Sequence, residues 1–152
     1  MSARCGPIVL LASIALVGAT PALAQDPEFA PALGVNLAEM QRTGRGVHYR
    51  DLTVGEGLAV STGFTVTIHY TGWLPDGTQF ETSRLDNEPV TFRLGDGKVI
   101  RGWEEGLRGM RPGGVRQLVV PARMAYGNRG LPPIIPPNTT LVFEIQLVST
   151  SR

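Results

Sequence analysis

The fold is decided by the stretch Lys98-Val-Ile-Arg-Gly-Trp-Glu-Glu-Gly-Leu107, in which a tryptophan stands between two glycines. If residues 101–110 form a short helix, Trp103, Leu107 and Met110 fall at i, i+4 and i+7 and share one face. We expect that face to point into the protein. The rest of the chain must then supply a surface against which it packs.

The two glycines make this helix dependent on its surroundings. Gly102 and Gly106 each weaken a helix by about 1 kcal/mol relative to alanine, so the segment needs tertiary contacts to persist. Val99 and Ile100 precede the helix, where a backbone N–H has no intrahelical partner and can be presented to a ligand. The stretch therefore predicts a pocket that is floored by an indole and edged by free amides, with a neighbouring sheet as support.

Strand patterns flank the helix on both sides. Residues 64–71 alternate apolar and polar side chains, and residues 140–148 place Leu141, Phe143 and Ile145 on one face, which is typical of half-buried strands. Strands with one polar face indicate an antiparallel sheet. We expect an α+β domain in which the antiparallel sheet curls around one short α-helix. Further strands are expected at 47–52, 78–81, 90–94 and 115–120, and one helical turn at 122–126.

The first residues have the features of a secretory signal peptide. Arg4 gives a positive n-region, residues 8–18 form an apolar run, and Ala22-Leu23-Ala24 is a small-x-small cleavage site. The apolar run is far shorter than the ~20 residues of a membrane-spanning helix, which favours a cleaved peptide over an anchor. We therefore expect residues 1–24 to be removed, the mature form to be free of the membrane, and the protein to be exported, most simply to a bacterial periplasm.

Residues 25–46 are interpreted as a linker or N-terminal arm that precedes a domain at 47–152. Only residues 37–41 have a helix-compatible pattern, and a helix this short is marginal in water. A dimerising helix is the alternative interpretation of these residues. The oligomeric state and the role of the arm stay open.

Composition excludes several classes of function. Cys5 is the only cysteine and lies in the predicted signal peptide, so the mature chain would have no thiol and no disulfide. Loss of Arg4 would leave 13 basic and 13 acidic residues, and Lys98 is the only lysine. Nucleic-acid binding needs clustered positive charge, which this pattern does not indicate. His48 and His69 are the only histidines; we expect both to be exposed strand residues, and we expect no metal and no cofactor.

The usual catalytic motifs are missing from the sequence, since it contains no G-x-S-x-G, no P-loop and no H-E-x-x-H. Five aromatic residues from separate segments are more informative. Each of them alone is more typical of a hydrophobic core. Together they exceed what one short helix can cover, which favours a partly open aromatic pocket. The five are Tyr70, Phe80, Trp103, Tyr126 and Phe143.

Five segments of the chain carry a family pattern: Ile68–Gly72, Asp76-Gly77 followed by Phe80, Val99–Gly106, Ala125–Gly127 and Ile134–Glu144. Together they resemble the FKBP-type peptidyl-prolyl cis-trans isomerase domain. The resemblance runs from about residue 60 to residue 148 without a gap and does not include the arm. It implies an antiparallel sheet curled around a short helix.

The resemblance also implies roles for individual residues. The target proline ring would lie over the indole of Trp103, while Ile100 would offer its backbone N–H and Tyr126 its hydroxyl to substrate carbonyls. Val90 and Ile135 would lie at the rim of the pocket. The remaining residues implied at the site are Tyr70, Phe80, Val99 and Phe143 in the pocket wall, with Glu81 as the acid beside them.

The sequence departs from the family pattern at three positions. Glu81 stands where the family usually has Asp, Asp86 where an Arg often pairs with that acid, and Pro133 where a loop glycine is usual. Arg84 is close enough in sequence to replace the missing arginine. We expect Glu81 to orient the pocket wall by accepting a hydrogen bond from Tyr70, and not to meet the substrate amide directly.

The function implied by the resemblance is peptidyl-prolyl cis-trans isomerisation, which would accelerate X-Pro bond rotation in exported proteins during folding. Its partners would be proline-containing unfolded or exported polypeptides and the macrolide inhibitors of the family. The alternative is a proline-peptide-binding module or holdase chaperone with weak turnover. The departures at Glu81 and Asp86 favour that alternative to some degree.

Overall fold

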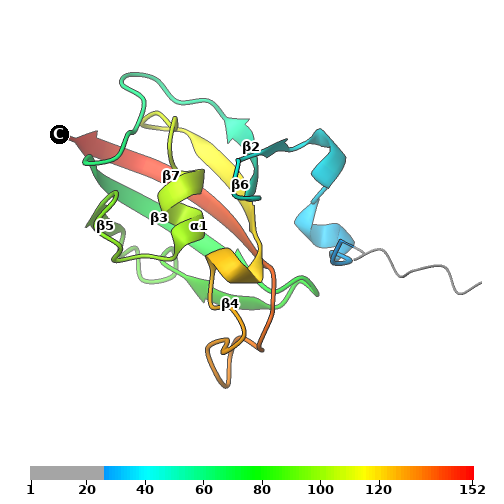
Figure 1. The fold of residues 1–152 in the computed structure, drawn as a ribbon. Coiled ribbons are helices and arrows are strands. Elements are labelled where there is room, and N and C mark those ends of the chain that lie inside the picture. Colours follow the sequence, from blue (N-terminus) through cyan, green and yellow to red (C-terminus); the bar gives the residue numbers. More distant parts are fainter. Residues whose placement is uncertain (1–25) are drawn as a thin grey trace, which may run out of the picture.

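A computed structural model describes residues 26–152, so the predicted signal peptide at 1–24 lies outside the described residues. Figure 1 shows one twisted sheet with helix α1 (Arg101–Gly106) packed across its inner face. Within the described range the sheet has seven strands in the order β1-β2-β6-β7-β3-β4, with β5 also paired to β3. All of the pairings are antiparallel. The predicted fold class is confirmed.

Apart from β1, each strand covers a segment that the sequence predicts. The strands are β1 (Gln41–Arg42), β2 (His48–Thr53), β3 (Thr65–Trp73), β4 (Gln79–Thr82), β5 (Val90–Arg93), β6 (Val115–Val120) and β7 (Leu141–Ser151). The 3₁₀ helices of residues 26–152 are η1 (Pro31–Leu33), η2 (Leu37–Glu39) and η3 (Ala122–Met124). No helix in this range has the length and apolar character needed to cross a membrane.

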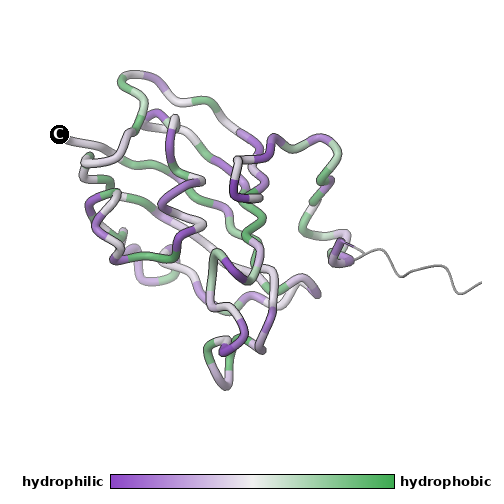
Figure 2. Tube along the Cα trace, in the orientation of Figure 1, coloured by the Kyte–Doolittle hydropathy of each residue, from purple (hydrophilic) through white to green (hydrophobic). Residues whose placement is uncertain are grey.

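The central strands β3 and β7 determine which side chains face the helix. In β3, Val66, Ile68 and Tyr70 are buried, whereas Thr67 and His69 between them are only partly covered. This alternation follows from the two-residue period of a strand. Figure 2 shows hydrophobic and hydrophilic residues alternating along the strands behind α1. The prediction that Tyr70 shares the inner face with Val66 and Ile68 is confirmed.

Helix α1 is shorter than predicted. It ends at Gly106 instead of Met110, and the chain then passes through turns to Gly109, whose φ of +80° lies outside the helical region. The inward-facing set is nevertheless as expected, because Trp103, Leu107 and Met110 are 7%, 1% and 3% exposed. The turn after the helix buries Met110 where a third helical turn was expected.

A buried arginine closes the C-terminal end of α1. Arg116 on β6 donates from Nη1 to the carbonyls of Gly106 and Arg108 at 2.8 and 2.9 Å. Its Nε and Nη2 donate to the two carboxylate oxygens of Asp51 at 2.6 and 3.1 Å. The last carbonyls of a helix have no intrahelical partner, and a cation placed there also interacts favourably with the helix dipole. Arg116 therefore ties β2, β6 and α1 together.

The N-terminal arm packs on the outer face of the sheet. Its strand β1 pairs with β2. In Figure 1 the arm lies beyond β2 and away from α1. Within the helix-compatible segment 37–41, the 3₁₀ helix η2 covers Leu37–Glu39, and strand β1 begins at Gln41. In the described part, the segment 25–46 is a packed arm and not a free linker. The outer-face cluster consists of Phe29, Leu33, Val35, Leu37, Met40, Trp73, Val119 and Val142.

Substitution of Gly102 by alanine is expected to destabilise the protein, although alanine is the better helix former. An added Cβ would lie 2.8 Å from Cγ2 of Val120 and closer still to Cγ1. Overpacking costs about 1–3 kcal/mol, against a gain of about 1 kcal/mol in helix propensity. We expect Gly102→Ala to lower the free energy of unfolding by up to about 2 kcal/mol in urea denaturation.

The matched control for this prediction is Gly44→Ala. A Cβ at Gly44 would meet nothing within 4 Å, so the free energy of unfolding should change by less than about 0.5 kcal/mol. Equal losses of stability in the two variants would show that the close contact between α1 and β6 is not the reason why Gly102→Ala destabilises the protein.

Candidate active site

A cavity of about 510 Å³ opens between α1, the inner face of the sheet and the segment after η3. This volume lies within the range of about 300–1,000 Å³ that is usual for small-ligand sites. Nine of the ten site residues predicted from the sequence line the cavity. Its lining consists of Tyr70, Phe80, Glu81, Val90, Gly97, Lys98, Val99, Ile100, Trp103, Ala125, Tyr126 and Phe143.

Aromatic rings in edge-to-face contact form the floor of the cavity. The Trp103 indole lies 4.7 Å from the Tyr70 ring at an interplanar angle of 69°, and 5.3 Å from the Phe143 ring at 81°. Phe80 lies 5.8 Å from Phe143 at 85°. Phe92 on β5 supports the indole from the core, with ring centroids 6.2 Å apart. Such pairs add about 0.5–1.5 kcal/mol each beyond the area that they bury, so they stabilise the floor of the cavity.

The indole is held by packing alone. Its Nε1 is buried and has no hydrogen-bond partner among the described residues. Leaving a buried donor unpaired costs about 1–3 kcal/mol, and most buried indole N–H groups do find a partner. The rings around Trp103 must therefore supply the energy that fixes its orientation.

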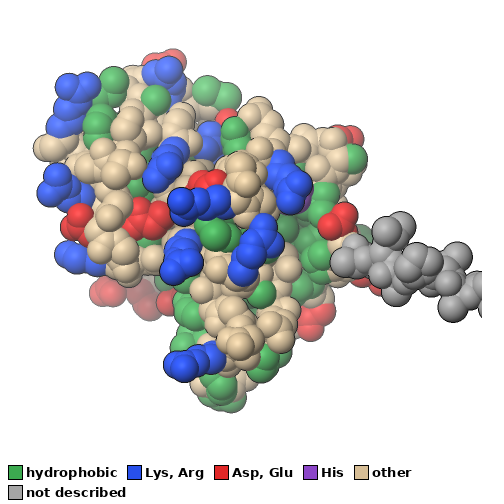
Figure 3. Space-filling view, in the orientation of Figure 1, with side chains coloured by type: hydrophobic (Ala, Val, Ile, Leu, Met, Phe, Trp, Pro, Cys, Tyr) green, Lys and Arg blue, Asp and Glu red, His purple; other side chains and the backbone are tan. Residues whose placement is uncertain are grey.

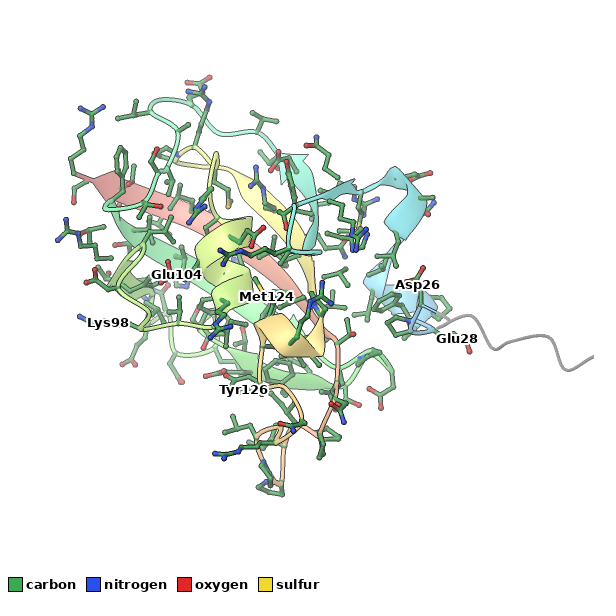
Figure 4. The ribbon with its side chains drawn as sticks, viewed as in Figure 1. Asp26, Glu28, Lys98, Glu104, Met124 and Tyr126 are labelled. Atoms are coloured by element: carbon green, nitrogen blue, oxygen red, sulfur yellow. The ribbon has the colours of Figure 1, made fainter. Side chains whose placement is uncertain are left out.

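Two hydrogen-bond donors at the edge of the cavity are free to bind a ligand. Ile100 is the N-cap of α1, and its carbonyl accepts from the N–H groups of Trp103 and Glu104 at 3.0 and 3.3 Å. The N–H of Ile100 has no partner within residues 26–152. Tyr126 follows η3, as Figure 4 shows, and its half-buried hydroxyl likewise lacks a hydrogen bond in the described structure. The predicted pair of donors is thus present at one site.

The carboxylate of Glu81 acts on both tyrosine hydroxyls. Burial, and secondly Glu81, raises the pKa of Tyr70 well above its ordinary value. Burial and the Glu81 charge also raise the pKa of Tyr126. A raised tyrosine pKa favours the protonated form, so both hydroxyls stay neutral donors at physiological pH. Glu81 therefore lies where it can orient this wall of the cavity.

The expectation that Arg84 replaces the missing partner of Glu81 is wrong. Arg84 donates to Gln146 Oε1 at 3.1 Å and lies 3.6 Å from Glu144 Oε1, on strand β7. Strand β3 pairs with both β4 and β7, so a side chain just past β4 reaches β7 across the polar face. Glu81 makes no ion pair within residues 26–152. Asp86 and Pro133, the other two departures, are exposed.

Ile135 does not lie at the rim of the cavity. It is 1% exposed and belongs to the main hydrophobic core, whereas its neighbour Ile134 is 51% exposed. Backbone hydrogen bonds between Leu131 and Ile135, at 2.8 and 2.9 Å, close this loop and turn Ile135 inward. The predicted role of Ile135 at the rim is corrected accordingly.

Three lining residues were missed by the sequence analysis: Gly97, Lys98 and Ala125. Gly97 and Lys98 directly precede Val99, and Ala125 directly precedes Tyr126, so adjacency along the chain was a usable signal. Lys98 is the only cation in the cavity lining of the described chain.

The histidines are partly buried and not exposed as expected. His69 Nδ1 lies 3.0 Å from Ser83 Oγ, within hydrogen-bond distance, while burial lowers the pKa of His48. Residues 26–152 contain no group of three or more His, Cys, Asp or Glu side chains that could hold a metal ion. Neither histidine lines the aromatic cavity.

Comparison with known proteins assigns the region that contains the cavity to a protein family. Residues 57–148 match the family model of FKBP-type peptidyl-prolyl cis-trans isomerase. The "FK506-binding protein" of Neisseria meningitidis serogroup A is 48% identical over 98 residues, which are 64% of this chain and 90% of that protein. Human "Peptidyl-prolyl cis-trans isomerase FKBP2" is 50% identical over 90 residues, which are 59% of this chain and 63% of the human protein. The crystal structure of FkpA from Escherichia coli has a TM-score of 0.68 at 42% identity, covering 74% of this chain and 51% of that one.

The raised tyrosine pKa values predict the result of an alkaline titration. Because the Tyr70 hydroxyl stays protonated beyond the ordinary tyrosine pKa, Tyr70→Phe should leave the phenolate absorbance change up to about pH 10 unaltered. The comparison is a spectrophotometric titration of the wild type and the variant. Loss of absorbance change below that pH in the variant would mean that Tyr70 ionises normally.

Proposed function

Because the chain belongs to the FKBP-type peptidyl-prolyl cis-trans isomerases, we propose that it accelerates rotation of X-Pro bonds in exported proteins while they fold. Its enzymatic activity is peptidyl-prolyl cis-trans isomerisation. One observation carries the proposed mechanism: an aromatic cavity with the Trp103 indole as floor and two unpaired donors, on Ile100 and Tyr126, at its edge.

The reaction needs a lower rotational barrier and no nucleophile. Rotation about a peptide C–N bond costs about 18–20 kcal/mol because the twisted amide loses its resonance. The planar amide is the more polar and better hydrated form, so an apolar cavity disfavours it relative to the twisted form. In this mechanism the proline ring lies over Trp103, with Tyr70 and Phe143 excluding water around it.

The two free donors hold the substrate while the bond turns. The N–H of Ile100 and the hydroxyl of Tyr126 would each bind a carbonyl of the segment that flanks the proline. Holding both neighbours fixed converts the free rotation of a chain into a rotation within a bound complex. Lowering the barrier by about 6–8 kcal/mol would correspond to roughly 10⁴ to 10⁶ in rate.

The proposal that the clients are exported proteins rests on the signal-like segment at residues 1–24. X-Pro bonds isomerise in tens to hundreds of seconds without a catalyst, which is slow for newly exported chains. Cell fractionation that finds the uncleaved protein in the cytoplasm would contradict this part of the proposal.

Macrolide inhibitors are proposed to occupy the same cavity. The relative from Neisseria meningitidis is named an FK506-binding protein, and the cavity of this chain is large enough for part of a drug-sized ligand. We expect FK506 to inhibit isomerisation competitively. Inhibition that leaves the KM for peptide unchanged would place the drug elsewhere.

The aromatic floor and the Tyr126 hydroxyl can be tested by activity. Tyr126→Phe removes one hydrogen bond and should lower kcat/KM for an X-Pro peptide by about 3–10-fold. Trp103→Ala opens the floor and should lower kcat/KM at least about 100-fold. The peptide should carry a bulky apolar X, and exchange between its isomers is measured by NMR.

The matched control is Trp73→Phe, because Trp73 lies on the outer face of the sheet and contacts the arm. It should keep the wild-type kcat/KM. Circular dichroism of each variant separates loss of the fold from loss of the floor. Wild-type protein without any rate above the uncatalysed exchange would refute the proposed activity for this chain.

A holdase function is the second candidate, and an exposed apolar loop favours it. Leu131 and Ile134 are 45% and 51% exposed, and they lie on the loop that follows Tyr126. Figure 2 shows the hydrophobic tip of this loop. Such side chains could hold unfolded segments beside the cavity. Aggregation suppression that survives Trp103→Ala but is lost in Leu131→Ser/Ile134→Ser would separate this function from isomerisation.

The Glu81 side chain is expected to orient the wall and not to touch the twisted amide. Its exposed carboxylate affects the pKa of both cavity tyrosines and makes no ion pair among the described residues. Glu81→Asp should therefore change kcat/KM less than about tenfold. A hundredfold gain in kcat/KM on shortening Glu81 to Asp would show that the glutamate impairs catalysis in this chain, and it would favour the binding-module alternative. Glu81→Gln and Glu81→Ala with the same peptide show whether charge or shape matters.

A further inference from the structure

A second hollow continues from the aromatic cavity to the outer side of α1. It has a volume of about 600 Å³ and shares Gly97, Val99, Ile100, Ala125 and Tyr126 with the cavity. An adjoining hollow of about 590 Å³ extends it toward the loop before β2. We call the two hollows together the arginine groove, because Arg101 and Arg123 line both and Arg45 lines the second.

The guanidinium groups of this groove lack close carboxylate partners. Arg101 is exposed and makes no ion pair or side-chain hydrogen bond within residues 26–152. Arg123 donates from Nη2 to the backbone carbonyl of Arg45 at 2.6 Å, and Arg45 approaches Glu105 only to 3.9 Å. Figure 3 shows basic side chains gathered over α1 and η3. Arg101 and Arg123 therefore present guanidinium groups that have no ion-pair partner among residues 26–152.

The carboxylate that lines the groove is already engaged. Glu104 accepts hydrogen bonds from the N–H groups of Gly95 and Gly97, the latter at 3.1 Å. Both bonds direct its oxygens toward the turn at 95–97. In the described part of the chain, no other carboxylate lines either hollow. A carboxylate on a bound peptide would meet Arg101 and Arg123 without displacing an internal partner.

We propose that the arginine groove binds an acidic side chain of the substrate, carried a few residues from the proline. The groove begins at Ile100 and Tyr126, the two residues that hold the flanking carbonyls, so a peptide in the cavity has a continuous path into it. Guanidinium groups recognise carboxylates in a planar, two-pronged geometry. This specificity rests on the isomerase function proposed above and adds a preference that the aromatic cavity does not provide.

The test uses a series of short peptides with one Leu-Pro bond, in which a single Glu or a single Gln stands two to four residues before or after the proline. The readout is the ratio of kcat/KM for each Glu peptide to that of its Gln twin. We expect a ratio of about 2- to 5-fold at neighbouring positions on one side of the proline. The ratio should fall as NaCl is raised and should approach one in Arg101→Gln/Arg123→Gln.

Arg108→Gln is the matched control, since Arg108 is exposed and lies outside the groove; it should keep the full ratio. The Gln peptides report the isomerase function separately, because their turnover does not depend on the groove. A ratio of one at every position, or a ratio that survives in the double variant, overturns the proposal and leaves the isomerase function intact.

Two other outcomes also decide the question. If the wild type turns over neither series, the isomerase function fails, and the same Glu-to-Gln ratio is then taken from peptide affinities measured by tryptophan fluorescence. Sedimentation with vesicles of anionic lipid, lost in the double variant while the peptide ratio is one, would assign the groove to a membrane surface and overturn the proposal.

Discussion

Close packing of α1 on β6 is the contact on which the site depends. Gly102 faces Val120 and Gly106 faces Leu118, and neither glycine has room for a Cβ without displacing its neighbour. The glycines weaken the helix, yet they allow it to approach the sheet closely. This approach brings Trp103 into contact with the aromatic rings of the inner face. A bulkier helix face would lift the indole away and open the floor of the cavity.

The same helix supplies one of the two donors, because the chain enters α1 at Ile100 and leaves its N–H unpaired among the described residues. Arg116 anchors the opposite end by binding the carbonyls of Gly106 and Arg108. The helix is thus held in place at its C-terminal end, while the N–H at its N-terminal end is unpaired and lies at the edge of the cavity without rearrangement. The chemistry suits this rigidity, since a twisting amide changes little in size and needs its neighbours held in place.

Much of the fold and site could be predicted from the sequence, because alternation in β3 and β7 and the spacing of Trp103 are local signals. What failed depends on the backbone conformation of individual turns and, for the arm, on contacts between distant segments. The helix ended early because Gly109 takes a positive φ. The arm became part of the fold through residues on β6 and β7. Ile135 turned inward through a bridge with Leu131, which no spacing rule indicates.

In the mechanism that we propose, the cavity lowers the rotational barrier by excluding water and holding carbonyls, without proton transfer or a covalent intermediate. The decisive measurement is the solvent deuterium isotope effect on kcat/KM, determined by NMR exchange on one X-Pro peptide with the intact protein. We expect a ratio close to one, because no proton moves in the step that is accelerated. A ratio clearly above one, which is expected when proton transfer limits the rate, would contradict this mechanism.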